Sequence, residues 1–164
     1  MILRHLFDQS FYLTKYPDVA GANIDPYTHF MIFGWKENRD PNLYFSTSFY
    51  KSVNPDVREE NKNPLAHYNE FGIAELRDPS PFFDTSVYLQ GNTDVANGST
   101  NPLEHFITYG DKEGRTGIDL FDAAFYLSNN TDVANEVNQG RTTAFEHFVR
   151  FGHKEGRDPS ANFN

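Results

Sequence analysis

The chain has 164 residues, no cysteine and a formal net charge of −9. This acidic balance argues against nucleic-acid binding or adsorption to an anionic membrane, because both require clustered Lys and Arg. The absence of Cys excludes disulfides, thiolate metal sites and Cys nucleophiles. The sequence also lacks an apolar run of the roughly 18 residues that a membrane span needs and a secretory h-region, so we expect no membrane insertion and no targeting signal in this chain.

Aromatic residues make up 16% of the sequence, and they recur at a fixed period. The segment LFDQSFYLTKYPDV, which starts at Leu6, returns in altered form at Tyr44, Phe82 and Leu120, each 38 residues after the last. We therefore predict a single repeat domain over residues 1–164. Its units are residues 6–43, 44–81, 82–119 and 120–161, and residues 162–164 are the start of a fifth unit or a cap.

The first segment of each unit is predicted to be a short helix. A polar residue that can cap new helical amides precedes it in every unit: Asp8, Ser46, Asp84 and Asp122. In the first unit this helix should end at Tyr16, because the following Pro17 disfavours helical geometry in the residue before it. A brief helical turn around Asp18 and Val19 follows.

The second segment is predicted to be another short helix. In the third unit Asn101 is its N-cap, Pro102 occupies the first helical position, and Glu104 completes a capping box. Leu103 and Phe106 fall on one apolar stripe at helical spacing. A glycine then follows the helix in every unit, where a left-handed residue would end it: Gly34, Gly72, Gly110 and Gly152.

The predicted fold class is all-α, with four units of about 38 residues and two short helices each. Two short helices cannot bury their own aromatic rings, so we expect the units to stack as a solenoid-like or compact repeat domain. The fourth unit has four extra residues within 134–142, a stretch that we predict to be a loop.

One histidine occupies the same position in every unit: His29, His67, His105 and His147. Imidazoles repeated in this way could bind a transition metal or another ligand. However, packed helices lie roughly 10 Å apart, which is too far for two ligands of one ion. We therefore predict no metal site and favour a structural role, in which each ring bonds a backbone carbonyl.

An arginine two residues after a glutamate also recurs: Arg39, Arg77, Arg115 and Arg157. Guanidinium groups bind carboxylates bidentately, so these residues could form a ladder for an acidic sugar. The favoured alternative is structural, in which the Arg ties the end of the unit to free helix carbonyls or to an Asp of a neighbouring unit. The equivalent carboxylates Asp18, Asp56, Asp94 and Asp132 are candidate calcium ligands, although the loops offer few further oxygens. Calcium is the only cofactor that the sequence leaves open.

The sequence predicts no enzyme and no catalytic residue. It contains no nucleophile elbow, P-loop, HExxH or dinucleotide-binding motif. Every candidate residue occurs four times in similar surroundings, whereas catalysis depends on one pocket with particular pKa values.

The two segments together resemble a repeat of bacterial surface and secreted proteins, often found beside hemolysin-type (RTX) calcium-binding repeats or appended to bacterial glycosyltransferases. The resemblance covers Leu6 to Pro159 and is most specific at Asp94-Val95, Asn101-Pro102-Leu103, His105-Phe106, Gly110 and Glu113-Gly114-Arg115. The chain departs from it at Asn38 and Leu76, where the pattern expects Gly, and at Thr142-Thr143-Ala144, where it expects Asn-Pro-Leu.

The resemblance implies a modular, extracellular or cell-surface, non-catalytic role within a larger protein. We expect a module for adhesion, anchoring or carbohydrate binding, whose partner is a cell-surface polysaccharide or another surface protein, with self-association also possible. The alternatives are a structural spacer between domains and an accessory domain of a glycosyltransferase.

Overall fold

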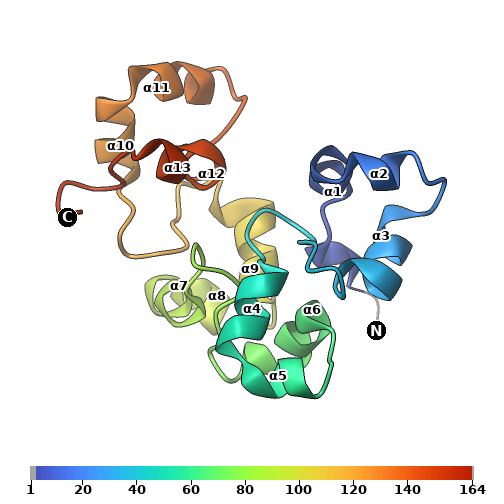
Figure 1. Cartoon of the computed structure of the whole chain (residues 1–164). Coiled ribbons are helices and arrows are strands. Elements are labelled where there is room, and N and C mark those ends of the chain that lie inside the picture. Colours follow the sequence, from blue (N-terminus) through green and yellow to red (C-terminus); the bar gives the residue numbers. More distant parts are fainter. Residues whose placement is uncertain (1–2, 164) are drawn as a thin grey trace.

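Short helices joined by turns make up the chain in this computed structural model, which describes residues 3–163 (Figure 1). The described residues contain no β-strand, only isolated bridges between Asn42 and Phe45 and between Ser80 and Phe83. The prediction of an all-α fold is confirmed. Within residues 3–163, no helix combines the length and apolarity that crossing a bilayer requires.

The same order of helices occurs in each predicted unit. A 3-10 turn, η1 (Arg4–Leu6), precedes the first of them. The elements of the first two units are α1 (Gln9–Lys15), α2 (Pro17–Ala20), α3 (Pro26–His29), η2 (Phe30–Gly34), α4 (Thr47–Val53), α5 (Pro55–Glu59), α6 (Pro64–His67) and η3 (Tyr68–Gly72). Those of the last two are α7 (Thr85–Gly91), α8 (Thr93–Ala96), α9 (Pro102–His105), η4 (Phe106–Gly110), α10 (Ala123–Asn129), α11 (Thr131–Asn138), α12 (Ala144–His147), η5 (Phe148–Gly152) and α13 (His153–Glu155).

The first three units thus contain three α-helices instead of the predicted two, because the turn expected at Asp18 and Val19 forms the separate helix α2, as do its counterparts. The fourth unit also contains α13. The predicted N-caps are confirmed. The Asp8 carboxylate accepts from the amide of Phe11, and the Asn101 side chain accepts from the amides of Leu103 and Glu104. Polar capping therefore marks the start of the first helix of each unit, whereas α2, α5, α8 and α11 have no side-chain cap.

The predicted loop in the fourth unit is partly wrong. Helix α11 spans eight residues, whereas its counterparts α2, α5 and α8 span four or five. The extra residues therefore lengthen this helix before the chain turns at Gly140, which has a φ of 68°. An insertion at the end of a short exposed helix adds to it without rotating any packed face.

The helix of the second segment changes its hydrogen-bonding pattern before it ends. After one α-helical turn it continues as a π-helix in all four units, η2 to η5. The amide of Asp111, for example, donates to the carbonyl of Phe106 at 3.1 Å, five residues back. Because of this wider turn, the residue after the glycine still has helical geometry, and the helix does not end at the glycine.

The predicted left-handed glycines are therefore wrong. Gly152 has a φ of −54°, and the positive φ values fall four residues after each of these glycines, at Asn38 (57°), Leu76 (53°), Gly114 (75°) and Gly156 (70°). These are the positions where the sequence pattern expects Gly, so the turn keeps its geometry even where Asn and Leu occupy it.

The glycines at the ends of the π-helices are required by packing. A Cβ atom on Gly110 would meet the hydroxyl oxygen of Tyr88 and lie 3.1 Å from the ring of Phe106. Gly34, Gly72 and Gly152 are covered in the same way by Tyr12, Tyr50 and Tyr126. The first helix of each unit thus packs its tyrosine directly on the backbone of the third.

This tyrosine is the centre of a small aromatic core within each unit. Tyr88 is 1% exposed, and its ring lies edge-on to Phe106 at 5.4 Å and beside Phe83 at 5.1 Å. Each unit also closes on itself through its backbone, as the amide of Asp84 donates to the carbonyl of Gly117 at 2.8 Å. The equivalent bonds join Asp8 to Pro41, Ser46 to Pro79 and Asp122 to Pro159.

Contacts between units involve the residues that open the second and third units, Tyr44 and Phe82. The ring of Tyr44, in the second unit, packs against Phe106 of the third at 5.0 Å and Phe145 of the fourth at 5.9 Å. Its hydroxyl donates to the buried carboxylate of Asp111 at 2.5 Å, and Thr143 donates to the other oxygen at 2.6 Å. Units that are not neighbours in sequence therefore share one interior, which explains the compact arrangement around α9 (Figure 1).

The first prediction concerns the glycine under the tyrosine. Gly110→Ala should destabilise the fold by about 1–3 kcal/mol, because the new methyl group overpacks the Tyr88 contact. Gly91→Ala is the matched control, since a Cβ there meets nothing within 4 Å, and it should stabilise α7 by about 0.5–1 kcal/mol. Urea denaturation of both variants measures the difference. Equal effects would contradict the packing requirement.

The second prediction concerns the left-handed position. Leu76→Gly should raise the free energy of unfolding, because a non-glycine residue in this conformation is disfavoured by about 1–2 kcal/mol, and the flexibility of Gly offsets only part of that gain. The reciprocal change Gly114→Leu should lower it. Thermal melting would refute the interpretation if both substitutions shifted the midpoint in the same direction.

Candidate functional site

The four histidines bond to the buried tyrosines of their own units. The distances between the tyrosine hydroxyl and histidine Nδ1 are 3.0 Å for Tyr12 and His29, 3.1 Å for Tyr50 and His67, and 2.9 Å for both Tyr88 with His105 and Tyr126 with His147. The predicted bonds to backbone carbonyls are therefore wrong. The structural role remains, because each ring fixes the hydroxyl that lies over the glycine.

Burial favours the uncharged forms of the tyrosines and of two of the histidines. It raises the pKa of Tyr88 to about 12, and it lowers the pKa of His67 and of His147. The protonated hydroxyl of the tyrosine can donate a hydrogen bond, and Nδ1 of a neutral imidazole can accept it. The pair is thus a hydrogen bond between uncharged groups, held in place by packing.

On its other side, each histidine carries an exposed aromatic ring. Phe33, Phe71, Tyr109 and Phe151 occupy one position of the repeat, and their exposed fractions are 48%, 44%, 55% and 51%. Their centroids lie 5.3–5.8 Å from the histidine rings. We call these four residues the exposed ring set.

Sequence analysis missed the exposed ring set, because its candidates were charged or imidazole side chains. A signal was present, since the apolar stripe already accounts for the core positions of this helix. An aromatic residue repeated four times just outside the stripe could have been recognised as a surface feature.

The four arginines bind the aspartates of their own units. Arg115 donates to both carboxylate oxygens of Asp94 at 3.0 and 2.9 Å, to Asn92 at 2.8 Å, and through Nε to Glu113 at 2.7 Å. Equivalent ion pairs join Arg39 to Asp18 and Glu37, Arg77 to Asp56 and Glu75, and Arg157 to Asp132 and Glu155. Each Arg therefore pairs with an Asp as expected, but the prediction of a neighbouring unit is wrong, because the Asp belongs to the same unit.

These ion pairs lower the pKa of the aspartate carboxylates and engage most of the hydrogen-bond donors of the guanidinium groups. Hydrogen bonds from Arg157 lower the pKa of Asp132 to about 2, and the same contact from Arg39, Arg77 and Arg115 lowers the pKa of Asp18, Asp56 and Asp94. With one cation between two carboxylates, each cluster is net negative. It offers acceptors for hydroxyl groups instead of a vacant fork for an acidic sugar.

The exposed rings and the ion clusters adjoin. In the second unit the Nε2 atom of His67, whose ring faces Phe71, lies 3.9 Å from Asp56. Within residues 3–163, no three His, Asp or Glu side chains converge as metal ligands. In the second unit Asp56 thus links the predicted His and Arg positions, and the described residues do not gather the four copies into one centre.

No protein-family model, curated protein or solved structure matches this chain. We therefore infer the function from the geometry of the residues of this chain. Two features of the surface stand out: the exposed ring set beside the ion clusters, and a cavity.

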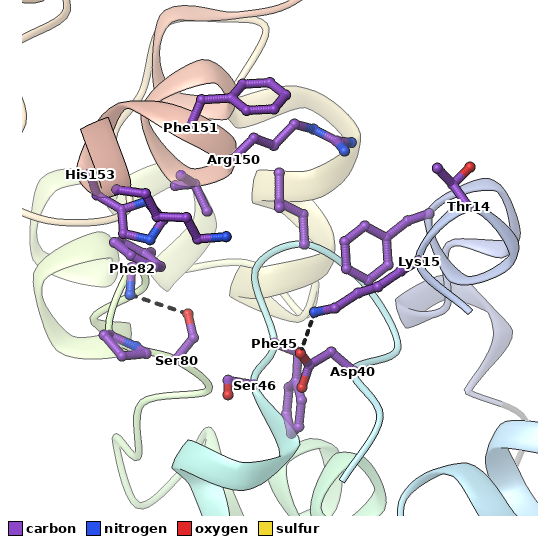
Figure 2. A pocket seen from close by; sticks show the side chains of 15 residues that line it. Thr14, Lys15, Asp40, Phe45, Ser46, Ser80, Phe82, Arg150, Phe151 and His153 are labelled. Atoms are coloured by element: carbon purple, nitrogen blue, oxygen red, sulfur yellow. Dashed lines mark hydrogen bonds and ion pairs between the residues drawn. The ribbon is translucent and has the colours of Figure 1, made fainter. Parts of the chain in front are cut away.

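The cavity, of about 470 Å³, lies where the first and fourth units face each other (Figure 2). Lys15 of α1 extends into it from one wall, and Arg150 and Phe151 of η5 form the opposite wall. Its floor comes from the residues that follow the two Asp-Pro turns, among them Ser46 and Phe82. It is the place where side chains from all four units meet.

The third prediction concerns acid stability. The ion pair of Asp132 has a folded-state pKa of about 2 against an ordinary value of 3.8, so its stabilisation is fully present above pH 3.8 and is lost as the pH falls towards 2. The difference in unfolding midpoint between the wild type and Asp132→Asn should therefore shrink between pH 5 and pH 2. It should also shrink in about 1 M salt, which screens exposed charges. A difference independent of pH would contradict this account.

Proposed function

We propose that this chain is a non-enzymatic repeat module of a bacterial surface or secreted protein, and that it binds carbohydrate through the exposed ring set. One observation carries the proposal: an aromatic ring about half exposed at the same position of all four predicted units. Scattered apolar side chains are common on protein surfaces, but a large ring kept exposed at each repeat of the pattern indicates a function.

The chemistry around each ring suits a sugar. The apolar C–H face of a pyranose stacks on an aromatic ring, and its hydroxyl groups donate to carboxylates. In the second unit Asp56 and Glu75 are each 47% exposed, and Arg77 fixes the position of both. Asp56 lies 3.9 Å from His67, whose ring faces Phe71. Preorganised acceptors lower the entropy lost on binding.

The repetition favours a polymeric ligand. Four weak and equivalent contacts on a rigid scaffold gain affinity when the ligand repeats as well, because each later contact is intramolecular. A cell-surface polysaccharide has this property. The resemblance of the sequence to repeats of surface and secreted proteins supports the same partner and location.

The neutral tyrosine–histidine pairs support a non-enzymatic role. A phenol with a pKa of about 12, such as that of Tyr88, stays protonated at neutral pH, and its contact with the glycine backbone leaves the hydroxyl no room to attack a substrate. The pairs are best explained as packing elements of a repeat domain whose second, third and fourth units share an interior at Tyr44.

The test is binding of the purified chain to an array of neutral and charged polysaccharides. The triple variant Phe33→Ala, Phe71→Ala, Tyr109→Ala should bind its best ligand roughly 30-fold more weakly, because three aromatic contacts of about 0.5–1.5 kcal/mol each are lost, and a tenfold change corresponds to about 1.4 kcal/mol. Phe151 is left intact because it also lines the cavity.

The matched control removes three other exposed apolar side chains, Ile32→Ala, Val53→Ala and Leu120→Ala, whose exposed fractions are 47%, 51% and 58%. This variant should bind like the wild type. The melting temperatures of the two triple variants should lie within a few degrees of that of the wild type. Equal losses in the two variants, or no retention on any polysaccharide, would leave the spacer as the function of the module.

A further inference from the structure

The cavity between the first and fourth units has a charge opposite to that of the chain. Its lining contains three cationic side chains, Lys15, Arg150 and Lys154, and one carboxylate, Asp40. The chain as a whole carries a net charge of −9. On an acidic protein, a cavity lined by cationic side chains raises the local concentration of anions.

The carboxylate of Asp40 is already engaged. One oxygen accepts from the Lys15 ammonium at 2.8 Å, and the other accepts from the amide of Thr47 at 2.8 Å. It serves to hold Lys15 and the start of α4 in place. The remaining positive charge of the cavity comes from the fourth unit.

The two cations of the fourth unit have donors to spare. Arg150 pairs with Glu146 through Nε, at 2.8 Å, and neither of its terminal nitrogens has a hydrogen-bond partner among residues 3–163. Lys154, which is exposed, forms no ion pair in the same range. Both side chains lie one turn apart on η5 and α13 and line the same cavity.

Aromatic rings form the apolar part of the cavity. Phe151 belongs to the exposed ring set, and Phe11 and Phe82 come from the first and third units. Arg150 and Phe151 stand next to each other on the same wall, as Figure 2 shows. A ligand that stacks on the ring would therefore bring its substituents within reach of the guanidinium group.

We propose that this cavity binds a sugar residue bearing a carboxylate, such as a uronic acid within a polysaccharide. The terminal nitrogens of Arg150 donate to the two carboxylate oxygens, a planar and bidentate match. Lys154 adds a second cation, and Phe151 stacks on the sugar ring. This inference rests on the proposed function, because it names the acidic residue of a carbohydrate ligand that the exposed ring set binds elsewhere along its length.

The volume and position of the cavity fit this role. A cavity of about 470 Å³ falls within the range of sites for small ligands, and it is open, so a polymer can continue beyond it. All four ion clusters, including that of Arg157 in the fourth unit, are net negative and lack such a fork. The cavity is thus the one acidic-sugar position that the described residues offer.

The experiment is an NMR titration of the full chain with tetragalacturonate and with its fully methyl-esterified form, which has the same shape without the charge. We expect tighter binding of the acid, with shifts at Arg150 and Lys154 and a steep loss of affinity with salt. Arg150→Gln and Lys154→Gln should each weaken binding of the acid about tenfold, as expected for a lost charge-assisted bond, and leave binding of the ester unchanged.

The matched control is Lys112→Gln, because Lys112 occupies in the third unit the position of Lys154 in the fourth and lies outside the cavity lining. Its binding should equal that of the wild type. Equal affinity for acid and ester, or an equal loss in Lys112→Gln, would overturn the inference while binding to neutral glycans through the exposed ring set could still stand. A sulfated tetrasaccharide that binds as tightly as the acid would overturn the choice of a carboxylate. If neither the titrated tetramers nor the array polysaccharides bind, both proposals fail together.

Discussion

The architecture depends on the contact between a tyrosine hydroxyl and a glycine backbone inside each unit. Tyr88 lies against Gly110 and bonds His105 at 2.9 Å, and its ring meets Phe106 edge-on. Because the glycine has no side chain, the first and third helices approach closely enough to enclose the ring. This single contact explains three repeated residues at once: the tyrosine needs the glycine for space and the histidine to satisfy its hydroxyl.

Each unit built in this way has its own aromatic core, but the units also pack against one another. Tyr44 inserts into an interior formed by the third and fourth units, where Phe106 and Phe145 surround its ring and the buried Asp111 accepts from its hydroxyl. Burial raises the pKa of that carboxyl, and two short hydrogen bonds satisfy it. Since this acid has no counterpart in the other units, the array is not uniform, and the cavity formed by its first and last units is unique.

The function that we propose involves the repeated side chains that do not take part in the core. Tyrosines, glycines and histidines are used in closing each unit, and arginines are neutralised by Asp and Glu of the same unit. The half-exposed rings and the exposed carboxylates remain, and we propose that they bind a neutral, hydroxylated ligand. In the same proposal, the unpaired donors of Arg150 and Lys154 bind an acidic residue of that polymer.

The sequence by itself determined the period, the helical class and the start of helices such as α1 and α9, because local capping by Asp8 and Asn101 needs no tertiary context. Its Arg and Asp positions were also recognisable as partners. Only the tertiary structure decided why Gly110 is needed, what His105 bonds and where Phe151 lies. Those roles depend on which side chains approach across tens of residues, and the spacing of a repeat does not encode the direction in which its units turn. For that reason the meeting of Lys15 and Arg150 in one cavity could not be predicted from their positions near opposite ends of the chain.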